Sequence, residues 1–370
     1  MNTDSKQPHS NRQEVQEHLE NNLMIDTLAG RATEGPPVWL MRQAGRYLPE
    51  YQEIRAKFPD FMSLCRNTDA TTEVALQPLR RFNLDAAIVF SDILTIADSL
   101  DLGLNFVKGS GPILSHPISS PKDITNLPFS EAIERLEYVY DAVKSLRSAL
   151  GKRLPIIGFS GSPWTQSCYM ISGRSEALFH TAKRFAYTHP VATTALINEL
   201  SSITAQYLLK QYQAGADILF VIDTWGGILS DTQFQSYSAN ALSDICASLK
   251  RMKCPAPVMF FSKGLTEKRI RMLKNITNLR CIGVDWTANI ESLQACFPDL
   301  VFQGNLDPSI LHAGPIATQQ HTHYMLNKVN KNTHYIAGLG HGVLPETPIE
   351  SVHAFVDQVR HYNIKDNNSN

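Results

Sequence analysis

Residues 216–227 read ADILFVIDTWGG, and this stretch decides the fold class. Its first seven residues are apolar except for one aspartate, which is typical of a parallel strand that is covered on both faces. The run ends in Asp223, Thr224 and, after a tryptophan, a pair of glycines, and these polar and small residues favour a turn. The stretch therefore predicts a buried strand that leads directly into a polar loop.

This unit, an apolar run followed by a polar turn, recurs along the chain. Eight runs are expected strands: Val38–Met41, Leu84–Phe90, Leu154–Phe159, Ala216–Ile222, Ala256–Phe261, Leu279–Val284, Leu300–Gln303 and His334–Ala337. Segments of helix length separate most of them, such as residues 130–150, where apolar residues recur at i, i+3, i+4 and i+7. Strands that alternate with helices predict a parallel sheet, and the lack of a Gly- or Ser-rich linker favours one domain.

Polar loops follow all eight runs: RQAGR (42–46), SDIL (91–94), SGSPWT (160–165), DTWGG (223–227), SKG (262–264), DW (285–286), GNLDP (304–308) and GLGHG (338–342). In a TIM barrel the active site is built from the loops at the carboxyl ends of the strands. An open sheet would typically carry a glycine-rich phosphate loop, and the sequence has no such motif. We therefore expect a single (β/α)8 TIM-type barrel over residues 21–363, with flexible polar tails at 1–20 and 364–370.

The composition excludes several other classes of protein. The formal net charge is −1, so the overall charge points to neither nucleic acid nor a membrane surface as a partner. The six cysteines show no C-x-x-C spacing, which argues against a disulfide scaffold and a ribbon-type zinc site. No apolar stretch reaches the ~18–20 residues of a membrane span, and the first residues lack the apolar core of a signal peptide. We expect a cytoplasmic protein.

Two arginines, Arg42 and Arg46, follow the first expected strand. Because they lie four residues apart, they would share one face of a helix, although Gly45 and Pro49 make a structured loop equally plausible. In either conformation two planar guanidinium groups can converge and hold carboxylates through paired hydrogen bonds. The plainer alternative is a pair of surface arginines, but the position at a strand end favours a site.

Four further side chains lie in or near the loops that follow expected strands. Asp92 closes a strongly apolar run, where it is either a helix cap or a carboxylate with an assigned role. Tyr169 is a core residue or a site residue, and Thr224 is a cap or a hydroxyl donor. His341 lies between two glycines, which leave its imidazole uncrowded, and a surface loop histidine is the plainer alternative.

Together these segments resemble the uroporphyrinogen decarboxylase family. The motifs MRQAGRYLPEY (41–51), FSDIL (90–94), GSPWT (161–165), DTWGG (223–227) and LGHGVLPETP (339–348) occur in the family's order. The first and the last of them are highly specific in combination, and the correspondence extends over about residues 22–363. The resemblance implies a (β/α)8-barrel homodimer with no metal or organic cofactor. It also implies the activity, which removes the carboxyl groups of four acetate side chains of uroporphyrinogen to give coproporphyrinogen in tetrapyrrole and haem biosynthesis.

The resemblance further implies roles for individual residues. Arg42 and Arg46 match the arginines that hold substrate carboxylates. The loop between them belongs to the same binding site: Gln43, Ala44 and Gly45. Asp92 matches the aspartate that accepts hydrogen bonds from the central pyrrole N–H groups of the substrate and stabilises a cationic intermediate.

Tyr169 matches the tyrosine near the reacting acetate, and with Arg42 and Asp92 it completes the implied catalytic set. Thr224 stands where the family has Ser or Thr in contact with a carboxylate, and His341 matches the histidine that contacts the substrate. Two other positions depart from the family pattern: Gly338, where the family often has Asn, and Ser162, where it usually has Ala.

The implied chemistry is physically coherent. Loss of CO2 from a pyrrole acetate leaves an electron pair, and a ring protonated beforehand can accept it. A fixed anion such as Asp92 would stabilise the positive charge of that ring, which is the inverse of an oxyanion hole. Because the substrate supplies its own electron sink, we expect neither a metal nor an organic cofactor.

Two alternatives stay open at this stage. The first is a zinc-dependent methyltransferase of the related barrel family that acts with cobalamin proteins, which would typically need an H-x-C pair and a distant cysteine. None of the twelve histidines lies two residues before a cysteine, so this alternative lacks its ligands. The second is a tetrapyrrole-binding protein without turnover, which would bind the macrocycle and release no decarboxylated product.

Overall fold

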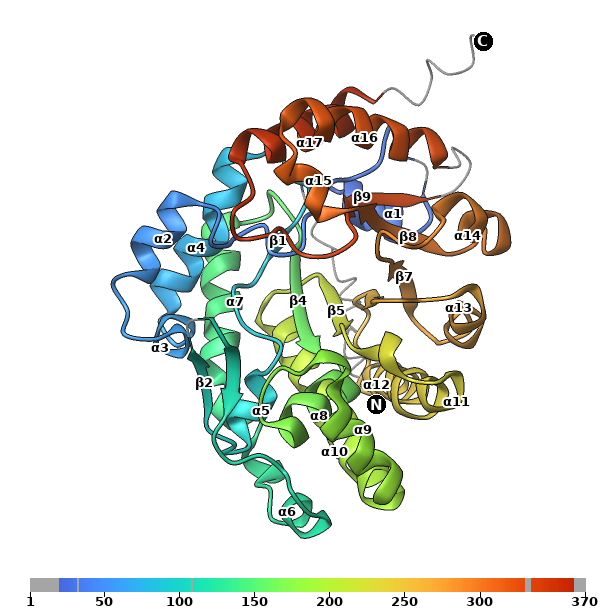
Figure 1. The fold of residues 1–370 in the computed structure, drawn as a ribbon. Coiled ribbons are helices and arrows are strands. Elements are labelled where there is room, and N and C mark those ends of the chain that lie inside the picture. The colour runs from blue at the N-terminus through green and yellow to red at the C-terminus, as the bar shows by residue number, and fades with distance from the viewer. Residues whose placement is uncertain (1–19, 32, 108, 330–333, 363–370) are drawn as a thin grey trace, which may run out of the picture.

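A curled parallel sheet, surrounded by helices, forms the centre of the molecule (Figure 1). The computed structural model describes residues 20–31, 33–107, 109–329 and 334–362, so the expected tails lie outside the described residues except for Glu20. The strands pair in the order β1-β4-β5-β6-β7-β8-β9. Their bounds are Ala87–Ile88 (β1), Ile156–Gly161 (β4), Ile218–Asp223 (β5), Val258–Ser262 (β6), Leu279–Gly283 (β7), Val301–Leu306 (β8) and Tyr335–Leu339 (β9).

The sheet closes through residues 38–40, which we call the first stave. Val38 forms an isolated parallel bridge with Ala337 of β9, and the N–H of Asp85, just before β1, donates to the Val38 carbonyl at 3.0 Å. The first stave thus lies between β9 and β1, and the expected (β/α)8 barrel is confirmed. The expected strand Val38–Met41 is reduced to a bridge, because the two prolines before it have no N–H to donate and a turn begins at Met41.

The helices lie outside the sheet, and most of them connect successive strands. Their bounds are Leu23–Leu28 (α1), Pro49–Arg55 (α2), Phe61–Cys65 (α3), Thr68–Arg81 (α4), Thr95–Ser99 (α5), Pro121–Thr125 (α6), Glu137–Leu150 (α7), Pro163–Ser172 (α8), His180–Thr188 (α9), Pro190–Ala214 (α10), Asp231–Phe234 (α11), Asn240–Arg251 (α12), Glu267–Leu273 (α13), Ile290–Cys296 (α14), Pro308–His312 (α15), Pro315–Lys328 (α16) and Ile349–His361 (α17). The helix expected within residues 130–150 is confirmed as α7. None of the described helices is long and apolar enough to cross a membrane.

A two-stranded hairpin outside the barrel was not predicted from the sequence. Its antiparallel strands, Leu104–Val107 (β2) and Gly111–Leu114 (β3), lie between α5 and α6. Each has only four residues and partly exposed side chains, so neither shows the long apolar run of a barrel strand. The N–H of Leu114 donates to the carbonyl of Gly173, which ties the hairpin to the segment that follows α8.

The Asp85 side chain links the segments that meet where the sheet closes. Its buried carboxylate accepts the Val38 N–H at 2.7 Å and the Asn21 side-chain amide at 3.0 Å, and it forms a 2.8 Å ion pair with Arg360 of α17. Arg360 also donates to the carbonyl of Asn83. One carboxylate therefore joins the first stave, β1, the N-terminal segment and the last described helix.

Replacing this carboxylate should weaken the fold. We expect Asp85→Ala to lower the free energy of unfolding by about 3 kcal/mol, because it leaves the Arg360 guanidinium and the Val38 N–H without their partner. Urea denaturation checks the value. Glu73→Gln, which removes an exposed ion pair with Arg80, is the matched control and should change stability by less than ~1 kcal/mol. Equal, small effects of the two changes would contradict the linking role.

Candidate active site

The predicted site residues lie at one end of the barrel, because each follows the carboxyl end of a stave. Arg42 follows the first stave, Asp92 follows β1, and Tyr169 lies on α8 after β4. Thr224 follows β5, and His341 follows β9. This arrangement matches the placement of active sites in TIM barrels, where strand-end loops from several parts of the chain surround one mouth.

The 42–46 loop is a series of turns and not a helix, so the arginines do not share a helical face. Arg42 has a φ of 62°, in the left-handed region. The Gln43 side chain is fully buried and donates to the carbonyl of Ala86 at 3.1 Å, while Tyr47 donates to the carbonyl of Gln43 at 2.7 Å. Gln43 therefore anchors the loop to the barrel wall, and Arg46 stays exposed to solvent.

The Arg42 side chain packs against the backbone at Gly342. A Cβ atom at Gly342 would overlap the Arg42 side chain, so the aliphatic part of Arg42 lies along the glycine backbone beside His341. Arg42 is exposed to solvent and yet has protein on most sides. Burial lowers its pKa, and the nearby Asp92 and Tyr169 oppose that change. Arginine remains protonated at neutral pH even so, and Arg42 provides a fixed positive charge next to Asp92.

Asp92 is not the cap of the following helix. Its Oδ1 accepts the Leu94 N–H at 2.8 Å in a local turn, and Leu94 is the residue at the cap position of α5. Burial raises the pKa of Asp92 to about 6, while the Leu94 N–H and the Arg42 charge act in the opposite direction. The carboxylate is therefore ionised at neutral pH, but its charge is poorly compensated and is available to a cationic or N–H-bearing partner.

Tyr169 belongs to an aromatic cluster that the sequence did not reveal. Its ring packs edge-on against Phe179 at 5.0 Å, and Phe179 packs against Trp225 at 4.8 Å. The Trp225 indole N–H donates to the Tyr169 hydroxyl at 3.3 Å. Leu178 and Phe179 both have positive φ values, so a strained backbone holds Phe179 in this cluster.

Asp223 was missed as a functional-site residue, and it supports the residues around it. Its fully buried carboxylate accepts hydrogen bonds from the hydroxyls of Ser162 at 2.5 Å, Thr165 at 2.8 Å and Ser238 at 2.6 Å. The Thr165 hydroxyl also accepts the Trp225 N–H at 3.1 Å. Burial raises the pKa of Asp223, and its three hydroxyl donors oppose that change.

Thr224, between Asp223 and Trp225, makes no capping hydrogen bond among the described residues, since Trp225 and Ser230 hold the cap positions of the short helices that follow. The simple cap interpretation of Thr224 is therefore wrong. Its backbone neighbours are fixed on both sides by the network around Asp223 and Thr165.

His341 is a neutral histidine. Burial, together with the charges of Arg42 and Lys263, lowers its pKa to about 4, and Asp285 opposes the change. The ring packs edge-on against Phe261 at 5.8 Å. At neutral pH His341 can therefore donate one hydrogen bond and accept another, and it adds no charge to the mouth.

The two departures from the family pattern have different consequences. Ser162 caps α8 by accepting the Thr165 N–H at 3.1 Å and also donates to Asp223, so it takes part in the network. At Gly338 a Cβ atom would overlap the Gln303 amide and lie 2.8 Å from the Trp39 carbonyl. A larger side chain at 338 would require Gln303 to move.

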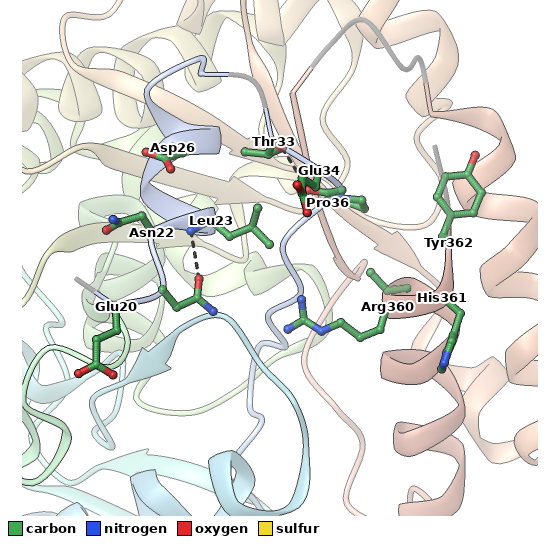
Figure 2. A pocket seen from close by; sticks show the side chains of 13 residues that line it. Glu20, Asn22, Leu23, Asp26, Thr33, Glu34, Pro36, Arg360, His361 and Tyr362 are labelled. Atoms are coloured by element: carbon green, nitrogen blue, oxygen red, sulfur yellow. Dashed lines mark hydrogen bonds between the residues drawn. The ribbon is translucent and has the colours of Figure 1, made fainter. Parts of the chain in front are cut away.

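A second hollow of about 880 Å³ lies at the opposite end of the barrel. Figure 2 shows side chains of the α17 end, including Arg360 and Tyr362, across from those near α1, such as Asn22 and Asp26. None of the predicted site residues lines it. Arg360, which lines the hollow, is already paired with Asp85.

The comparisons with known proteins identify the family of the chain. Residues 19–362 match the model of the family described as Uroporphyrinogen decarboxylase (URO-D). A uroporphyrinogen decarboxylase of Coxiella burnetii is 40% identical over 352 residues, which are 94% of this chain and 96% of that relative. One of Pseudoalteromonas atlantica is 43% identical over 349 residues, 93% of this chain and 97% of that relative.

Among solved structures, a methyltransferase from Methanosarcina mazei superposes with a TM-score of 0.78 at 15% identity, covering 93% of this chain and 99% of that one. This likeness concerns the fold. The fold and the site thus define a (β/α)8-barrel enzyme whose mouth carries two neighbouring arginines and the half-buried carboxylate of Asp92. The chain belongs to the uroporphyrinogen decarboxylase family.

The raised pKa of Asp92 makes a prediction about stability. A carboxyl that binds its proton more tightly in the folded state stabilises the fold at low pH, and this contribution is lost as pH rises from 3.8 through about 6. Asp92→Asn, which keeps the acceptor for Leu94, should therefore raise the free energy of unfolding at pH 8 by about 1–2 kcal/mol. The gain should shrink toward pH 4. Urea denaturation at both pH values checks this, and a less stable variant at pH 8 would contradict it.

Proposed function

We propose that this protein is a uroporphyrinogen decarboxylase that removes the four acetate carboxyl groups of uroporphyrinogen and yields coproporphyrinogen. The observation that carries the proposal is the position of Asp92, a half-buried carboxylate whose charge interacts with that of Arg42 at the mouth of a barrel of this family. A site for carboxylates would gain nothing from an added anion, unless that anion acts on positive charge.

Asp92 supplies that anion. In the proposed reaction a ring carbon of the pyrrole is protonated, the acetate loses CO2, and the electrons of the broken bond enter the ring. A proton then adds to the side-chain carbon and the ring proton leaves, so that each acetate becomes a methyl group. Asp92 accepts hydrogen bonds from the central pyrrole N–H groups and stabilises the cationic ring. Because burial removes most of the competing solvent, its charge acts strongly over this short distance. One oxygen is held by Leu94, which fixes the direction of the other.

The remaining site residues position the substrate. Arg42 and Arg46 hold its carboxylates, while Gln43, Ala44 and Gly45 form the loop that sets their spacing. Tyr169 lies near the reacting acetate, with its hydroxyl oriented by Trp225. Thr224 and the neutral His341 donate hydrogen bonds to further carboxylates.

We also propose that residues 21–363 form one catalytic domain, that the protein acts in the cytoplasm as a homodimer, and that it requires no cofactor. The dimer proposal is supported by exposed apolar side chains at Leu178, Tyr187 and Val191. Leu178 lies just before α9, whereas Tyr187 and Val191 lie at the junction of α9 and α10, which is on the mouth side of the barrel because α10 ends where β5 begins. Exposed apolar patches of this kind favour protein contacts. Sedimentation equilibrium measures the state directly.

The methyltransferase alternative lacks support at the site. The described residues contain no group of three or more His, Cys, Asp or Glu side chains that could hold a metal ion. Five of the six cysteines are buried, and burial raises the pKa of Cys65 and Cys168, the two that interact with predicted site residues, well above that of a free thiol. Anaerobic incubation with uroporphyrinogen, with carboxyl groups counted by chromatography, tests the proposal. Stepwise loss of four carboxyl groups with and without chelator supports it, and binding without product would favour the carrier alternative.

Asp92→Asn should separate catalysis from binding. We expect kcat to fall by roughly 10²–10³, because the lost interaction is with charge that develops in the transition state. KM should change by less than about threefold. The increased stability expected for this variant excludes unfolding as the cause. Normal kcat with a raised KM would instead make Asp92 a binding residue.

Arg42→Lys and Arg46→Lys test the geometry of carboxylate binding. Lysine keeps the charge but loses the planar pair of donors, so kcat/KM should fall by about tenfold or more for each change. Since the substrate carries eight carboxylates and the protein is nearly neutral overall, kcat/KM should also decrease with added salt. Two fully active variants and a salt-independent kcat/KM would show that the substrate binds elsewhere.

A further inference from the structure

One wall of the mouth carries none of the proposed site residues. The eight staves run in the order first stave, β1, β4, β5, β6, β7, β8 and β9. The proposed site residues follow the first four of these and the last. β6 is the fifth stave and lies across the barrel from the first, which carries Arg42 and Arg46. The loops after β6 and β7 hold Lys263 and Trp286.

Lys263 and Trp286 form a pair at this wall. The Lys263 Nζ lies 5.2 Å from the centre of the Trp286 ring, a cation–π contact. Trp286 is 38% exposed, which is unusual for so large an apolar side chain. Lys263 is exposed as well, and within the described residues it has no carboxylate in ion-pair distance. The pair thus presents an uncompensated positive charge on an aromatic support.

The backbone around Lys263 is fixed by the neighbouring loops. The N–H of Gly264 donates to the carboxylate of Asp285, which is buried and also accepts from the N–H of Thr287 at 2.8 Å and from its hydroxyl at 2.5 Å. A Cβ atom at Gly227 would overlap the Lys263 carbonyl, so the loop after β5 packs directly against it. The backbone that carries the Lys263 side chain is therefore held in place before any ligand arrives.

Two close backbone contacts join this wall to the proposed site. A Cβ atom at Gly340 would overlap the N–H of Trp286, so the residue before His341 rests on the Trp286 backbone. The residue after His341, Gly342, packs on the side chain of Arg42. The charges of Lys263 and Arg42 both act on the His341 ring.

We propose that Lys263, supported by Trp286, binds a carboxylate of the substrate on the side of the macrocycle that faces away from Arg42 and Arg46. This inference rests on the proposed function. Uroporphyrinogen carries carboxylate side chains around its whole perimeter, so a ring bound in the mouth directs some of them toward the β6 and β7 loops. The arginines cannot serve these distant carboxylates, whereas Lys263 has a fixed backbone and is unpaired at that wall.

Steady-state kinetics with uroporphyrinogen, under anaerobic conditions, tests the role of Lys263. We expect Lys263→Gln to raise KM by roughly tenfold, the effect of one charge-assisted hydrogen bond in a partly exposed place, and to change kcat by less than about twofold. Lys263→Arg, which keeps the charge and can still stack on Trp286, should stay within about threefold of wild type. Lys274→Gln is the matched control, because it removes an equal charge at the far end of α13.

The outcomes separate the two proposals. If wild-type protein releases no decarboxylated product, the proposed function fails. If wild type is active and Lys263→Gln matches Lys274→Gln in KM, the role of Lys263 is overturned. A lower kcat at unchanged KM would also overturn it. Trp286→Leu keeps Lys263 but removes its support, and a KM between wild type and Lys263→Gln is expected, while no change would contradict the pairing. Thermal unfolding verifies that each variant is folded.

Discussion

The hydrogen bonds between Val38 and Asp85 close the barrel, and the geometry of the mouth depends on that closure. Val38 donates to the Asp85 carboxylate, and its carbonyl accepts the Asp85 N–H. The arginine loop begins a few residues after Val38, and Asp92 follows Asp85 at the end of β1. The distance between the proposed carboxylate-binding loop and the proposed catalytic anion is therefore set by two backbone segments that are joined directly.

Within that frame, the electrostatics of the mouth result from opposing effects. Burial disfavours every charge, and it raises the pKa of Asp92 and lowers that of His341. Arg42 compensates Asp92 in part, yet it also contributes to keeping His341 neutral. The mouth thus holds fixed cations at its edges, a neutral hydrogen-bonding group beside them and an anion in its depth. Such an order of charges suits a ligand with acidic arms and a positively polarised centre.

Most of the barrel was predictable from the sequence, because a buried parallel strand has a simple sequence pattern, an apolar run that ends at a polar turn. Seven expected strands and the closing segment agree with the structure. The β2–β3 hairpin has no such pattern, since its strands are short and partly exposed. The loop conformation of 42–46 was also undecided, because the positive φ of Arg42 depends on the packing of Gln43 and Gly342 and not on local preference.

The site was predictable only where its residues stand next to strand ends. Family resemblance supplied roles for Arg42, Asp92 and Tyr169 that spacing alone could not. Asp223 and its network escaped notice, because the hydroxyl donors come from segments up to 61 residues away along the chain. Lys263 escaped for a similar reason, since its aromatic support, Trp286, lies in the loop after the next strand. Contacts of this kind exist only after the loops have been brought together.

The left-handed backbone of Arg42 bears on how this protein can evolve. A residue with a side chain in that conformation is less stable than glycine by about 1 kcal/mol, so the fold itself favours glycine or asparagine at this position. Random drift, or laboratory selection for heat resistance alone, would tend to replace Arg42 and lose the group that faces Asp92. Arginine persists there only under selection for what it binds. Thermostable variants of this chain should accordingly be sought with position 42 held constant.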